Sequence, residues 1–290
     1  MFRSIEGVYP APQRHWVGDG FHVAGYFSAI PNAVRKLDPF LMLDYHMPHH
    51  YPPAPRPRGV GVHPHRGFET VTLAWQGRVA HHDSTGAGGV IGPGDVQWMT
   101  AGSGILHKEY HEADWSKQGG TFQMAQLWVN LPKRDKMEAP HYQALAAADM
   151  GQVVLPAEAG VVRIVAGAFE GVRGPAVTHS PINVFDVRLN PAGKVTFHAP
   201  AHQNLAILVM QGDLEVNGNA RATANDFVVF QNAGDEVEVV AHSPAHLLVL
   251  NGEPLREPVV QYGPFVMTSR AEIEQAILDY QGGKFGHLAN

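Results

Sequence analysis

The chain of 290 residues contains no cysteine. Disulfide bonds and thiolate metal ligands are therefore both excluded. Long apolar runs are also missing, since no stretch approaches the length of a membrane span and the first residues lack the apolar core of a secretory signal. Together these absences predict a cytoplasmic protein with no membrane partner.

Positive charge is sparse. The 21 Lys and Arg residues are outnumbered by 27 Asp and Glu residues, which gives a formal net charge of -6, and no dense basic run occurs. This balance argues against direct binding to nucleic acid or to an anionic membrane surface. Hydrophobic residues make up 44% and charged residues 17% of the chain, as is typical of a globular protein.

Histidine, in contrast, is abundant, with 18 residues. His63 and His65 are separated by one residue, and His107 and Glu109 repeat that spacing. Side chains alternate between the two faces of a strand, so the members of each pair point to the same side. Brought together inside a barrel, the two pairs would offer three imidazoles and one carboxylate to a single divalent first-row metal.

Short β-rich runs separated by glycine and proline predict an all-β fold. The chain holds 31 Gly and 22 Pro, and they punctuate runs such as Thr70–Trp75, Gln126–Leu131 and Leu247–Leu250. Frequent turn signals between short strands indicate a sandwich or barrel.

The two halves of the chain resemble each other. When Gln76-Gly77 is placed over Gln211-Gly212, the apolar run Val71–Trp75 falls on Ala206–Met210. On the same alignment the segment 63–65 falls on 198–200, which lacks the second histidine. We interpret this as a duplicated barrel in which only the first copy keeps the metal ligands. The predicted domains are an N-terminal barrel over 1–140, a linker over 141–152, and a C-terminal barrel over 153–290.

One helix is predicted near the end of the chain. Ser269 is a good N-cap, and Glu272 completes a capping box. Ile273, Ala276 and Ile277 then follow at helical spacing, so this short helix is expected to pack on a barrel.

Four longer motifs carry a resemblance to a known family. They are HPHRGFETVT (63–72), GDVQWMTAGSGILHKE (94–109), LWVNLP (127–132) and GEPLREPVVQYGPFVM (252–267). The chain resembles the pirin family of the cupin superfamily, including its quercetin 2,3-dioxygenase-like bicupins. The resemblance implies two tandem cupin (jelly-roll-like) β-barrels with a metal in the N-terminal one.

The resemblance also implies the ligand set and the metal. The family's ligands correspond to His63, His65, His107 and Glu109, and its usual metal is Fe(II), although Ni, Mn, Co, Cu or Zn would suit the same donors. Glu69 shares the parity of His63 and His65 and is the alternative carboxylate. The family pattern favours Glu109, which leaves Glu69 either to support the ligands from outside or to act as a structural partner, for example of Arg66. A closed structural zinc site remains open as another interpretation.

Three further residues are candidates for the lining of a pocket. One of His81 and His82 must face inward on its strand, and Gln126 carries an amide that could orient a substrate. Glu109 is a candidate general base, because a carboxylate ligand could accept the proton of a substrate hydroxyl.

Two functions follow from the resemblance. Some pirins cleave the central ring of the flavonol quercetin with O2, releasing carbon monoxide, which implies a small aromatic substrate and an oxidoreductase. Others act as iron-binding, redox-responsive regulators through protein-protein contacts. Isomerase or hydrolase chemistry also suits a cupin site, because a fold does not fix a function.

Overall fold

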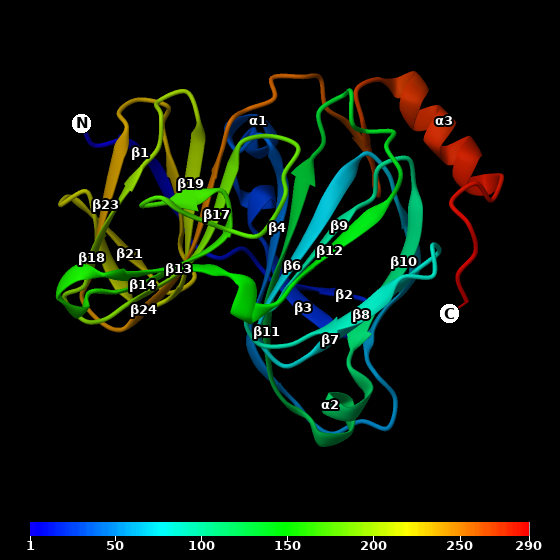
Figure 1. Ribbon diagram of the computed structural model, residues 1–290, viewed down its shortest axis with the longest axis horizontal. Coiled ribbons are helices and arrows are strands. Elements are labelled where there is room, and N and C mark those ends of the chain that lie inside the picture. Colours follow the sequence, from blue (N-terminus) through cyan, green and yellow to red (C-terminus); the bar gives the residue numbers. More distant parts are fainter. Residues whose placement is uncertain (290) are drawn as a thin grey trace. The chain divides into compact units, whose positions relative to one another are not determined.

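The computed structural model describes residues 1–289, which form a mostly β structure with a few short helices (Figure 1). Contacts divide the chain into two units. The first barrel comprises Gln13–Gly25, Phe40–Ala147 and the segment from Arg256 onward. The second barrel comprises Met1–Pro12, Tyr26–Pro39 and Ala148–Leu255. No helix among the described residues is long and apolar enough to cross a membrane.

The first barrel consists of two antiparallel sheets. Its seven-stranded sheet has the spatial order β12 (His141–Leu145), β9 (Val96–Thr100), β6 (Phe68–Gln76), β11 (Gly120–Asn130), β4 (Phe40–Tyr51), β3 (Phe21–Gly25) and β2 (His15–Val17). Its four-stranded sheet has the order β5 (Gly59–His65), β10 (Ile105–His111), β7 (Val79–Asp83) and β8 (Gly88–Ile91).

The second barrel repeats this plan. Its seven-stranded sheet has the order β1 (Ile5–Tyr9), β22 (Phe227–Phe230), β19 (Asn204–Gln211), β24 (Ala245–Gly252), β17 (Ile182–Leu189), β14 (Gly160–Ala166) and β13 (Gly151–Leu155). Its four-stranded sheet has the order β18 (Lys194–His198), β23 (Glu236–Ala241), β20 (Asp213–Val216) and β21 (Ala220–Thr223). Strand β19 occupies the place of β6, and β18 that of β5, as the internal alignment of the sequence predicts.

Shorter elements complete the chain. Two small ribbons pair β15 (Ala168–Phe169) with β16 (Val172–Arg173) and β25 (Val260–Tyr262) with β26 (Phe265–Met267). The α-helices are α1 (Ala33–Lys36), α2 (Ala113–Gln118) and α3 (Arg270–Gln281). The 3-10 turns are η1 (Tyr26–Ala29), η2 (Ala147–Asp149) and η3 (Pro156–Glu158).

Neither unit is a single continuous stretch of the sequence, so the units differ from the predicted domains, 1–140 and 153–290. Strand β1 pairs with β22 and completes the second barrel, whereas β12, expected within a linker, pairs with β9 of the first. The edge of an antiparallel sheet presents unpaired N–H and C=O groups, and a strand from any part of the chain can satisfy them.

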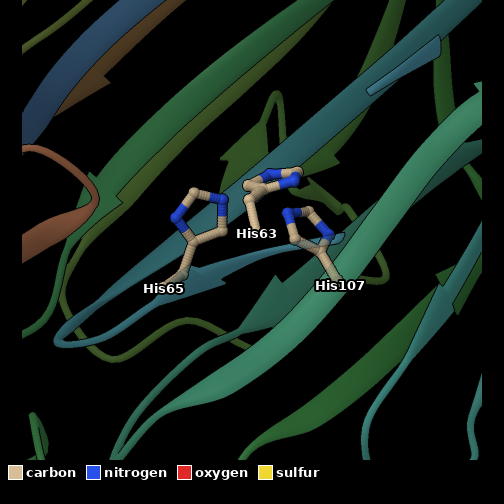
Figure 2. Close-up of side chains that lie close together, drawn as sticks. All are labelled: His63, His65 and His107. Carbon is tan, nitrogen blue, oxygen red and sulfur yellow. The ribbon is translucent and has the colours of Figure 1, made fainter. Parts of the chain in front are cut away.

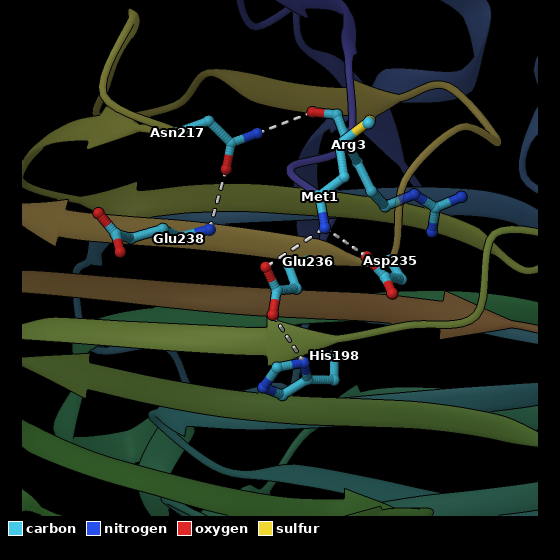
Figure 3. A network of polar contacts seen from close by, with 7 residues as sticks. All are labelled: Met1, Arg3, His198, Asn217, Asp235, Glu236 and Glu238. Atoms are coloured by element: carbon cyan, nitrogen blue, oxygen red, sulfur yellow. Dashed lines mark hydrogen bonds and ion pairs between the residues drawn. The ribbon is translucent and has the colours of Figure 1, made fainter.

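Polar contacts fix the start of the chain to the second barrel (Figure 3). The amino group of Met1 forms an ion pair of 2.8 Å with Asp235. The side chain of Asn217 donates to the carbonyl of Arg3 at 2.8 Å and accepts from the amide of Glu238 at 2.9 Å. Residues 1–12 therefore belong structurally with strands more than 200 positions away.

The interior of the second barrel is apolar. At the place where the first barrel has its histidine strand, Phe197 of β18 faces Val237 of β23 in the strand register, and both belong to one large buried cluster. Hydrocarbon side chains occupy the interior at this strand pair, and among residues 1–289 the three-histidine cluster is found in the first barrel.

The predicted C-terminal helix is confirmed as α3. The hydroxyl of Ser269 accepts a hydrogen bond from the amide of Glu272 at 3.3 Å, and the Glu272 carboxylate accepts from the amide of Thr268 at 2.9 Å. Ile273 and Ala276 are buried against Phe265, so the helix packs on the ribbon β25–β26 within the first barrel.

Candidate metal centre

Three histidines from two neighbouring strands converge inside the first barrel (Figure 2). His63 and His65 lie on β5, and His107 lies on β10 directly opposite His63 in the register. One ring nitrogen from each histidine lies within 4.8 Å of the others. The ring centroid of His107 is 4.2 Å from that of His63 and 4.7 Å from that of His65. The i, i+2 spacing thus produces the convergence that strand alternation requires.

Two of these rings, those of His65 and His107, are deeply buried and have nitrogens without partners. His65 is 3% exposed and His107 is fully buried. Among residues 1–289, no group forms a hydrogen bond with either ring nitrogen of His107. The same is true of the Nδ1 atom of His65. Burial lowers the pKa of both residues well below the ordinary value, so both imidazoles are neutral and keep a lone pair. Buried polar atoms are normally satisfied, and a divalent cation would satisfy one nitrogen of each ring, the one that keeps the lone pair.

The tautomer of His63 is set by its neighbour. Its Nδ1 atom lies 2.8 Å from the carbonyl oxygen of Gly61, which can only accept a hydrogen bond. Nδ1 therefore carries the proton, and Nε2 keeps the lone pair. A backbone carbonyl commonly holds a metal-binding histidine in this way.

Glu109 lies beside the histidine cluster. Its Oε2 atom accepts a hydrogen bond from the amide of Gln126 at 2.9 Å, and its Oε1 atom accepts from the hydroxyl of Thr72 at 3.3 Å. Burial raises the pKa of this carboxyl, while His63 and the two hydrogen bonds oppose the shift. The carboxylate is thus held in place by residues of the opposite sheet.

A pocket opens onto this group of residues. Its volume is about 390 Å³, which lies in the range of small-molecule sites. His63, His65 and Glu109 form part of its wall. The rest of the lining is mostly apolar: Val17, Phe21, Val23, Met42, Asp44, Val60, Met124, Gln126, Trp128 and Pro264.

Glu69, the alternative carboxylate, lies elsewhere. It is 1% exposed, and its Oε1 atom accepts a hydrogen bond from the hydroxyl of Thr100 at 2.8 Å. It belongs neither to the histidine cluster nor to the pocket lining. Glu69 was expected to point to the same side as His65, and it does not. The chain reverses at Gly67, where φ is +86°, so the alternation of side chains along β5 does not continue into β6.

The structure separates the other candidate pocket residues. His81 faces the barrel interior, where its ring stacks on that of Tyr142 at 5.0 Å and burial lowers its pKa to about 4. His82 is exposed, and its Nδ1 atom lies 2.8 Å from the Tyr110 hydroxyl. Of the three candidates, only Gln126 lines the pocket.

Sequence reasoning missed Asp44, a second carboxylate of the pocket wall. The signal was present, because Asp44 is a single charge within the apolar run Phe40–Tyr45. A strand that buries both neighbours of a carboxylate places that carboxylate on the face opposite to theirs.

Two antiparallel barrels of matching topology, one of them with converging histidines, define a bicupin protein. Residues 20–129 match the family model named Pirin, and residues 184–286 match the Pirin C-terminal cupin domain. The chain belongs to the pirin family.

Individual relatives extend this similarity over the whole chain. A protein of Pseudomonas aeruginosa named "Putative quercetin 2,3-dioxygenase" is 50% identical over 283 residues, covering 98% of each chain. Human pirin is 37% identical over 259 residues, covering 87% of this chain and 84% of its own. The crystal structure of quercetin 2,3-dioxygenase from Acinetobacter baumannii matches with a TM-score of 0.94 at 42% identity, covering 100% of both chains.

Proposed function

We propose that this protein is a mononuclear metal-dependent dioxygenase that opens the central ring of a flavonol of the quercetin type. The observation that carries the proposal is the histidine cluster at the wall of a mostly apolar pocket of about 390 Å³. A closed structural metal site needs no such cavity. The relatives named as quercetin 2,3-dioxygenases support the same substrate class.

His63, His65 and His107 would hold the metal, with Glu109 as a fourth ligand. Fe(II) is the metal we propose, and Ni, Mn, Co, Cu and Zn are the alternatives that these donors accept. When bound, such a metal would lower the pKa of a substrate hydroxyl and bring the substrate next to dioxygen.

The protein's own groups prepare the substrate. Burial raises the pKa of Glu109, which makes its carboxylate a better proton acceptor for the substrate hydroxyl. Gln126 keeps that carboxylate oriented through its hydrogen bond. Trp128, whose ring centroid lies 4.2 Å from that of Phe68, offers a rigid apolar surface to an aromatic ring.

The test is dioxygen consumption. Protein reconstituted separately with Fe, Mn, Ni, Co or Cu is given quercetin in an oxygen electrode, and carbon monoxide is measured in the headspace. The proposal expects matched uptake of dioxygen and release of carbon monoxide with at least one metal. No uptake with any of the five metals would leave the regulatory function, acting through protein partners, as the better explanation.

A further inference from the structure

The pocket wall contains a carboxylate that the proposed chemistry does not use. Asp44 lies on β4 and lines the pocket among apolar side chains such as Met42 and Val23. In the strand register it lies directly opposite Gln126 of β11. It therefore faces the same cavity as the amide that holds Glu109.

Asp44 has no hydrogen-bonded partner among the described residues, and the imidazole of His15 is the group that acts on its charge. Within residues 1–289 its carboxylate accepts no hydrogen bond and forms no ion pair, although the side chain is partly buried. Burial raises the pKa of Asp44 to about 6, and the neighbouring imidazole of His15 opposes that shift only in part. An unpaired carboxylate in an apolar wall destabilises the free protein, and groups of this kind gather at ligand sites.

The sheet sets the distance between the two carboxylates. Thr72, Gln126 and Asp44 occupy one row across the adjacent strands β6, β11 and β4. Glu109 is bonded to the first two of these side chains. Adjacent strands are about 4.8 Å apart, so Asp44 lies one strand further along the wall. A flat substrate with one hydroxyl beside Glu109 would extend along this row toward Asp44.

We propose that Asp44 is a specificity-determining residue that accepts a hydrogen bond from a hydroxyl at the end of the substrate remote from the histidines. This inference rests on the proposed function, because it assigns the far end of the same substrate. The ligand class is a polyhydroxylated planar aromatic compound. The side chains of Val23 and Met42 in the same wall have no hydrogen-bonding group of comparable strength with which to replace this contact.

The expected selectivity is moderate. A hydrogen bond to a charged group changes binding by about 10- to 100-fold when the partner is removed. Wild-type protein should therefore prefer quercetin by about that factor over one of two analogues. Galangin lacks the hydroxyls of the pendant ring, and 3,3',4'-trihydroxyflavone lacks those of the fused ring, so the two compounds together cover both ends of the molecule.

Two variants and one control test the role of Asp44. Asp44→Leu should bind quercetin and the disfavoured analogue about equally well. Asp44→Asn, which keeps the shape and one acceptor oxygen, should give a ratio of affinities between those of Asp44→Leu and the wild type. Met42→Leu alters the same strand and the same wall, and it should change kcat/KM for all three flavonols by one common factor. Removal of an unpaired charge should leave the Tm of Asp44→Leu at or above that of the wild type.

Dissociation constants measured anaerobically by calorimetry separate this inference from the proposed function. Discrimination in binding that is lost in Asp44→Leu supports the role of Asp44, even if dioxygen uptake fails and the dioxygenase proposal falls. The role of Asp44 is overturned if the wild type binds all three flavonols with equal affinity. It is also overturned if Asp44→Leu discriminates among the three flavonols as strongly as the wild type. Neither result would contradict the dioxygenase proposal if the dioxygen-uptake assay is positive.

Discussion

The Nε2 atom of Gln126 lies 2.9 Å from the Oε2 atom of Glu109 across the interior of the first barrel. The two residues belong to strands of opposite sheets. The amide donates to the carboxylate and thereby fixes its orientation beside the three histidines. The same amide faces the pocket, so one side chain connects the substrate cavity with the candidate base.

Replacement of Gln126 should therefore impair turnover more than metal binding. In Gln126→Leu, the Glu109 carboxylate keeps only the longer contact with Thr72 and loses its fixed orientation. We expect kcat for the flavonol to fall about five- to tenfold, since a single hydrogen bond contributes roughly 1 kcal/mol. Metal content by elemental analysis should stay within error of the wild type, and loss of the metal would instead show that Gln126 supports the ligands.

Removal of a proposed ligand histidine should remove most of the metal and leave the fold intact. His107→Ala deletes a ring whose two nitrogens have no partner in the described chain, so we expect most of the metal to be lost in elemental analysis. His82→Ala is the matched control, because His82 is an exposed histidine of the same four-stranded sheet. Circular dichroism should remain β-rich in both variants, and full metal retention by His107→Ala would discard this ligand.

The reversal between the histidine strand β5 and β6 depends on Gly67. A Cβ atom at this position would lie 2.1 Å from the carbonyl oxygen of Val266, and φ is +86°. Gly67→Ala should therefore displace the segment beside His65, lower the free energy of unfolding by several kcal/mol and reduce metal binding.

Gly86 provides the control for that substitution. Its φ is +87°, but an added Cβ would meet nothing within 4 Å. Gly86→Ala should carry only the conformational cost, about 1 kcal/mol. Urea unfolding of both variants measures the difference, and equal losses of stability would contradict the role of the close approach to Val266.

Buried His46 should make the protein sensitive to acid. Its Nδ1 atom lies 2.9 Å from the Met47 carbonyl oxygen and its Nε2 atom 2.8 Å from the Tyr51 hydroxyl, and burial lowers its pKa to about 4 from 6.5. The unfolded chain binds the proton more readily, so the contribution to stability is present above pH 6.5 and is lost as the pH falls toward 4.

A comparison of wild type with His46→Gln isolates this effect. Between pH 6.5 and pH 4 the wild type should lose up to about 3 kcal/mol more of its free energy of unfolding than the variant, as follows from the shift in pKa. Chemical denaturation at several pH values gives both curves. Parallel curves would show that His46 is not the group that takes up the proton.

The sequence alone determined the features that depend on local geometry. Strand alternation is a property of the extended backbone, so the spacing of His63 and His65 was enough to predict their shared face. The capping box at Ser269 and Glu272 is likewise local, and it identified the helix α3. The internal alignment correctly matched β6 with β19, because duplicated strands keep their apolar pattern.

Only the tertiary structure decided the features that depend on the pairing of distant strands. It assigned β1 to the second barrel and β12 to the first, because a sheet edge can be completed from anywhere in the chain. It turned Glu69 toward Thr100, because the reversal at Gly67 breaks the alternation. It also brought Asp44 of β4 into line with Gln126 of β11, and that register is set by hydrogen bonds between strands about 80 residues apart in the chain.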